Sequence, residues 1–73
     1  MLSYEDSVSV IEQFYKDSVL WHRLGGLNIY QAIREAEKEV EIIDRSPFEY
    51  IKGYIDPRAK QDFLRDLNAV EAV

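Results

Sequence analysis

The feature that most constrains the fold is an uninterrupted segment from Tyr4 to Leu24, which contains neither proline nor glycine. These two residues are the ones that most strongly interrupt helices. Apolar side chains recur in the segment at spacings of 4, 3, 4 and 4, which is the period of an amphipathic helix, and they form one stripe: Tyr4, Val8, Ile11, Tyr15 and Val19. Ser3 is placed to cap the first turn. We therefore predict a helix over residues 4–24, about six turns long.

The next segment carries a start signal of its own. Asn28 is a favourable N-cap, and Gln31, three residues later, completes a capping box. Apolar residues then recur from Ile29 to Ile43 with a short heptad-like spacing. We predict a helix over residues 29–45 that runs antiparallel to the first, and we expect Gly25 to be the left-handed residue that ends the first helix.

Two further helix starts are marked by proline. Ser46 precedes Pro47 and Asp56 precedes Pro57, and proline is tolerated at the first helical position because its missing N–H would have no partner there. These signals predict short helices over about 47–55 and 57–69. Since no alternation with a period of two is present, the expected fold class is all-α. We expect a small helical bundle, with residues 1–73 forming a single domain in which a long helical hairpin carries two short helices.

Length and composition limit the ways in which such a chain can be stable. A domain of 73 residues buries only about 60–65% of the surface that its unfolded chain exposes. The sequence has no cysteine, so neither a disulfide nor a thiolate zinc site supplements the core. Apolar residues make up 47% of the chain, which is too many for a disordered tail. Helix packing or self-association must therefore supply the stability.

The sequence also predicts a location. Its beginning carries Glu5 and Asp6 where a secretory signal carries basic residues. No uncharged run reaches the roughly 18 residues that a membrane span requires. We therefore expect a cytoplasmic protein without a membrane partner.

Ser18 and His22 are the residues that most resemble a catalytic pair, because they lie one helical turn apart. Nucleophilic catalysis also requires an acid that orients the histidine and donors that stabilise an oxyanion, and no sequence pattern supplies them. The basic residues His22 and Arg23 are in addition favoured at a helix end by the helix dipole. Glycine-rich phosphate loops are absent as well. We expect a helix end rather than an active site, and no enzyme, cofactor or metal.

The acidic run of the second predicted helix offers a contact surface. Glu37, Glu41 and Asp44 share one flank, and Glu35 and Glu39 share the other. On a half-exposed helix we expect the pKa values of these carboxyl groups to stay near their usual values, so a solvated face is the simplest interpretation. The first flank could instead contact a basic partner, and its charge would steer such an encounter.

A helix-turn-helix arrangement within residues 46–70 is the alternative functional interpretation. Arg58, Gln61, Arg65 and Asn68 share one face of the last predicted helix and have the chemistry that reads base edges. The net charge of −5 opposes the approach to phosphates that supplies most of the affinity for DNA. A nucleic-acid partner is therefore the less favoured prediction.

The preferred interpretation is a non-enzymatic protein-binding module with a regulatory or inhibitory role. Four apolar side chains of the first helix point to several sides and exceed what one small core can bury: Phe14, Leu20, Trp21 and Leu24. Aromatic side chains commonly anchor interface cores. We expect them to mediate binding to a protein partner, in the first place a second copy in a homodimer.

Overall fold

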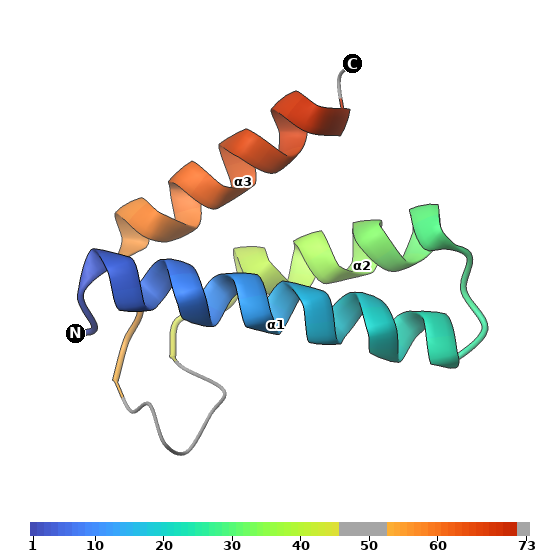
Figure 1. The fold of residues 1–73 in the computed structure, drawn as a ribbon, viewed down its shortest axis with the longest axis horizontal. Helices are drawn as coiled ribbons and strands as arrows, with labels where there is room; N and C mark the ends of the chain where they lie inside the picture. The colour runs from blue at the N-terminus through green and yellow to red at the C-terminus, as the bar shows by residue number, and fades with distance from the viewer. Residues whose placement is uncertain (46–52, 72–73) are drawn as a thin grey trace.

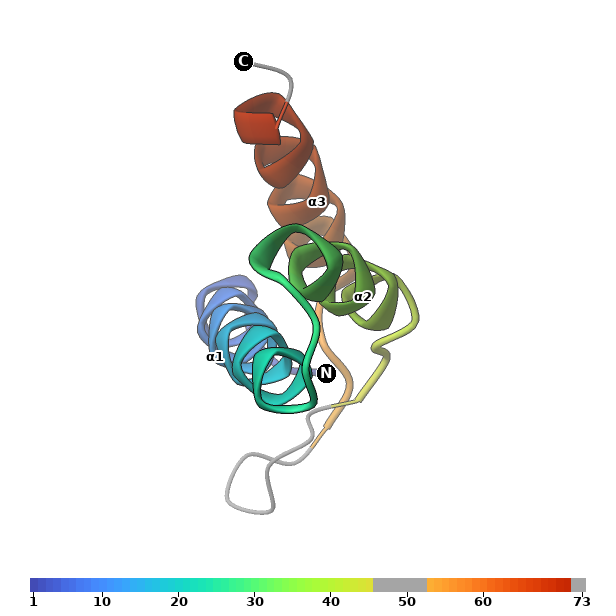
Figure 2. The same ribbon diagram turned by 90° about the vertical axis from the view of Figure 1, so that its right-hand side faces the viewer.

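The computed structural model describes residues 1–45 and 53–71, and three helices account for most of them: α1 (Tyr4–Leu24), α2 (Ile29–Glu41) and α3 (Pro57–Glu71). Helices α1 and α2 form an antiparallel hairpin, and α3 begins near the start of α1 and then leads away from both (Figure 1, Figure 2). The described residues contain no strand, although Arg45 and Tyr54 form an isolated antiparallel bridge. The predicted class, an all-α small helical bundle, is confirmed.

Local hydrogen bonds explain where each helix begins. The Ser3 hydroxyl accepts the amide of the third residue after it, at 3.1 Å. Asn28 and Gln31 form the complete capping box, with distances of 2.9 and 3.1 Å. The Asp56 carboxylate accepts the backbone amide of Arg58 at 2.9 Å, ahead of the proline that opens α3. Each of these contacts satisfies an amide that would otherwise lack a partner in the first turn.

The end of α1 corrects one expectation. Gly25 keeps a right-handed backbone with φ of −78°, and Gly26 is the residue with positive φ, at 105°. The amide of Gly26 donates to the carbonyl of Arg23, and the amide of Leu27 donates to the carbonyl of His22, both at 3.1 Å. This is a Schellman motif. The left-handed turn comes one residue later than predicted because the Gly25 amide still donates to a helical carbonyl.

The segment between α2 and α3 also differs from expectation. Helix α2 ends at Glu41 rather than at residue 45, and α3 continues to Glu71 rather than ending at 69. Of the predicted helix over 47–55, residues 47–52 lie outside the described residues, and 53–55 are not helical. Backbone pairing is the reason, because the amide of Ile55 donates to the carbonyl of Asp44 at 3.1 Å.

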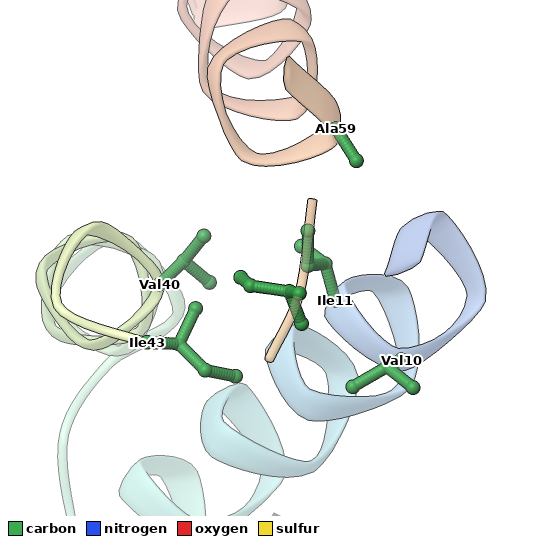
Figure 3. Packing of buried hydrophobic residues seen from close by; sticks show 6 residues of the cluster. Val10, Ile11, Val40, Ile43 and Ala59 are labelled. Carbon is green, nitrogen blue, oxygen red and sulfur yellow. The ribbon is translucent and has the colours of Figure 1, made fainter. Parts of the chain in front are cut away.

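The core lies where the two hairpin helices meet the start of α3 (Figure 3). Its buried members come from α1, from α2 and the residues after it, from the segment before α3 and from the first turn of α3: Val10, Ile11, Val40, Ile43, Ile55 and Ala59. The predicted apolar seam of the second helix is confirmed from its middle onward, since Ala36, Val40 and Ile43 are buried. Leu2, Phe14 and Phe63 are among the half-buried side chains that pack around this cluster.

The buried side of α1 is turned relative to the predicted stripe. Ser7 and Ser18 are buried, whereas Tyr4, a predicted member of the stripe, is partly exposed. The Ser7 hydroxyl accepts the backbone amide of Asp56 at 2.7 Å and so joins α1 to the start of α3. A small polar side chain lets these two segments approach closely, and the hydrogen bond satisfies an amide that is buried between them.

Candidate protein-binding surface and polar cluster

The C-terminal end of α1 exposes three large apolar side chains. Leu20, Trp21 and Leu24 are 57%, 73% and 74% exposed, and we call these three residues the α1 patch. Phe14, the fourth residue expected at an interface, is half-buried and packs against the core. The α1 patch is the part of the predicted surface that is open to a partner.

Residues at the start of α2 extend the apolar character of this end of the hairpin. Tyr30 is 75% exposed and Ile29 is partly exposed. Residues 18–33 contain no acidic residue, although the chain as a whole has a net charge of −5. The hairpin end is therefore the part of the long helices where a second molecule meets the least acidic charge.

A polar cluster joins α1 to α2 one turn from the α1 patch. The Ser18 hydroxyl donates to Oε2 of Glu39 at 2.6 Å, and Nε2 of His22 lies 2.7 Å from Oε1 of the same carboxylate. Ser18 is buried, and the other two side chains are partly exposed. Both oxygens of one carboxylate thus bind neighbouring turns of α1, which fixes the rotation of the two helices about each other.

The order of groups in this cluster does not suit nucleophilic catalysis. A serine nucleophile requires the imidazole between its hydroxyl and the acid, so that the ring can accept the proton. Here the carboxylate of Glu39 lies between Ser18 and His22. The hydroxyl therefore donates to an acid that stays ionised at neutral pH, and the arrangement serves as a structural contact.

The same contacts correct the expectation that the carboxylates of α2 keep ordinary pKa values. The hydrogen bond from Ser18, and then the bond and the charge of His22, hold the pKa of Glu39 below its usual value, although partial burial opposes them. The sequence suggested that a Ser and His pair was possible but did not identify Glu39 as its partner. The signal available was that Ser18 and His22 lie four residues apart on the face that packs against α2.

The predicted acidic contact surface is partly neutralised by α3. Lys60 donates to the backbone carbonyl of Glu41 at 3.1 Å, and its ammonium group lies 3.5 Å from the carboxylate of Asp44. Glu41 and Asp44 are exposed, and Glu37 is half-buried. A basic residue of the chain itself, Lys60, therefore already lies at the end of this predicted surface.

The four residues proposed for DNA contact lie on α3, and all of them are exposed: Arg58, Gln61, Arg65 and Asn68. The two arginines already have acidic partners. The Arg58 guanidinium binds both carboxylate oxygens of Asp56, at 2.8 and 3.3 Å, which holds the pKa of that carboxyl below its usual value. Arg65 lies 3.3 Å from Asp62. A phosphate would have to compete with these carboxylates.

Within residues 1–45 and 53–71, no three side chains of the metal-binding types come together in a group that could hold an ion. Over the same residues, no helix combines the length and the apolar character needed to cross a membrane.

Comparisons with known proteins add no constraint: no family model, no curated protein and no solved structure matches this chain.

Proposed function

We propose that this chain is a non-enzymatic protein-binding module with a regulatory or inhibitory role, and that it self-associates through the α1 patch. The observation that carries the proposal is the exposure of Leu20, Trp21 and Leu24 on neighbouring turns of the longest helix. Exposed apolar clusters of this kind are costly unless a partner covers them. Tryptophan is in addition the residue type most enriched among the anchors of interfaces.

Charge supports a second copy as the partner. A two-fold interface brings the same surface of two molecules together, so any charge at its centre meets its like. The α1 patch is uncharged, and the residues from 18 to 33 around it include no acid. Two acidic molecules therefore approach with the least repulsion at this end of the hairpin.

The polar cluster supports a structural rather than a catalytic role for this end of the molecule. The bonds from Ser18 and His22 to Glu39 hold α1 against α2 beside the α1 patch. A rigid surface loses less conformational entropy when it binds. The cluster thus holds the end of α1 in place and lowers the entropy that the α1 patch loses on association.

DNA binding through α3 receives less support. Its two arginines are paired with carboxylates of the same chain. The described end of the predicted preceding helix, residues 53–55, is not helical. A duplex-binding assay at low salt tests this alternative, since a double Arg58→Ala, Arg65→Ala variant must abolish any salt-sensitive affinity that is found.

Light scattering on a sizing column across a concentration series tests the main proposal. We expect a dimer that dissociates on dilution, and Leu24→Ala is expected to weaken it at least roughly tenfold, because every removed CH₂ was worth about 0.8 kcal/mol when buried. Ile42→Ala is the matched control, because Ile42 directly follows α2, lies outside the patch and is 77% exposed. A monomer at every concentration, or equal effects of the two substitutions, would contradict the proposal.

A further inference from the structure

A groove on another side of the molecule separates α1 from α3. Helix α3 leaves the bundle toward its C-terminal end (Figure 1, Figure 2). The cavity between the two helices measures about 360 Å³ and is lined by Glu12, Tyr15, Lys16, Phe63 and Leu67. None of these residues belongs to the α1 patch, so the groove is a separate feature of the surface.

Aromatic and aliphatic side chains form the apolar part of the groove. The rings of Tyr15 and Phe63 meet edge to face, with centroids 5.4 Å apart and an angle of 66° between their planes. This geometry is favourable for aromatic rings. Leu67 continues the apolar wall along α3 by one further turn. A flat apolar group fits against such walls.

Two opposite charges border the same groove. Glu12 and Lys16 are exposed and lie one turn apart on α1, a spacing at which such side chains often pair with each other. Within residues 1–45 and 53–71 neither of them forms an ion pair. The groove therefore offers one anion and one cation beside an apolar wall.

The size of the groove determines the kind of occupant. Sites for small molecules range over about 300–1,000 Å³, and this cavity lies near the lower end of that range. A packed helix has a diameter of about 10 Å including side chains and needs a much longer trough. One ring with a short charged head group matches the space and the charges.

We propose that the groove between α1 and α3 binds a small aromatic zwitterion of the amino-acid type. Its ring lies against Phe63 and Leu67, its carboxylate pairs with Lys16, and its ammonium group pairs with Glu12. The apolar wall supplies the burial, and the two charges select a head group that carries both signs. Because the charged residues are exposed, the selection is modest and weakens as salt increases.

The test uses the full chain, amide NMR spectra and three matched probes. L-Phenylalanine carries both charges, 3-phenylpropionate lacks the ammonium group, and 2-phenylethylamine lacks the carboxylate. We expect saturable shifts centred on the amides of residues 12–16 and 63–67, with a dissociation constant for L-phenylalanine on the order of 1 mM. Both singly charged probes are expected to bind more weakly than the zwitterion.

Charge variants separate the two halves of the proposal. Lys16→Gln is expected to weaken L-phenylalanine and 3-phenylpropionate about two- to fivefold while leaving 2-phenylethylamine unchanged. Glu12→Gln is expected to weaken L-phenylalanine and 2-phenylethylamine instead. Lys38→Gln and Glu5→Gln are controls, because both residues are exposed outside the groove.

Three results would overturn the inference. The first is the absence of saturable shifts with L-phenylalanine at tens of millimolar. The second is a set of shifts centred outside residues 12–16 and 63–67. The third is a lack of charge selection, seen either as equal binding of the three probes or as equal effects of Lys16→Gln and Lys38→Gln.

Discussion

Replacing Ser7 by alanine tests how α1 is joined to α3. The side chain is fully buried, and its hydroxyl oxygen accepts the backbone amide of Asp56 at 2.7 Å. In the Ser7→Ala variant the shape of the side chain is nearly unchanged, but the amide loses its acceptor. The Asp56 residue is itself buried, so water has little access to that amide.

The expected cost follows from that loss. A buried donor without a partner costs about 1–3 kcal/mol. A chain of 73 residues has a total stability on the order of 4–11 kcal/mol. For a domain of this size each kcal/mol lowers the melting temperature by roughly 4–8 °C, so the Ser7→Ala variant is expected to melt roughly 5–20 °C below the unmodified protein.

Ser9→Ala is the matched control for this experiment. Ser9 lies on the same helix and is exposed, so the substitution gives the same gain in helix propensity, a few tenths of a kcal/mol, without removing a buried contact. Urea unfolding followed by circular dichroism measures both free energies. If the two variants differ by less than about 0.5 kcal/mol, the Asp56 amide finds another partner and the reasoning is refuted.

Three further substitutions test other contacts. The pKa of Glu39 is lowered from 4.5 in the folded chain, so the contribution of this carboxylate to stability is present above that pH and is lost as the pH falls through the lower, folded pKa. The difference in unfolding free energy between the unmodified protein and Glu39→Gln should therefore shrink on acidification below pH 4.5. A difference in urea unfolding that stays constant with pH would contradict this. Gly26→Ala should cost about 1–2 kcal/mol, because φ of 105° strains any residue with a Cβ atom. Gly25→Ala, at φ of −78° with no contact nearer than 3.5 Å, should be neutral or stabilising by up to about 1 kcal/mol. If urea unfolding shows Gly25→Ala to be the more destabilised of the two variants, the assignment of the left-handed position to Gly26 is wrong.

The ends of the helices were the most predictable part of the fold. Ser3, Asn28 and Asp56 cap their helices as the sequence indicated. These contacts join residues two or three positions apart, so the sequence around each start contains all the partners. The same locality made the length of α1 predictable from its apolar period.

Local sequence signals did not predict the backbone of the described residues between 42 and 55. This backbone is determined by pairing between Asp44 and Ile55 and between Leu2 and Tyr54, which are distant in sequence. A local capping signal at Pro47 predicts a helix, but no local signal reveals that residue 54 pairs with residue 45. Tertiary contacts override helical propensity at residues 53–55, the described end of the predicted helix.

The polar cluster and the contact between Ser7 and Asp56 could not be predicted from the sequence for a related reason. Ser18 and Glu39 are 21 residues apart, and Ser7 and Asp56 are 49 residues apart. Apolar periodicity does not predict which serines are buried, because their burial depends on a hydrogen-bond partner that only the folded chain supplies. The rotation of α1 away from its predicted stripe is the visible consequence.

These buried polar contacts also explain how the α1 patch can remain exposed. The hydrogen bond that Ser7 accepts and the one that Ser18 donates hold α1 against its neighbours on the side opposite Leu20 and Leu24. The apolar side chains at the end of α1 therefore contribute little to the isolated fold. It follows that Leu24→Ala should change association far more than stability, whereas Ser18→Ala should lower stability first, and this opposite pattern distinguishes a binding surface from a poorly packed core.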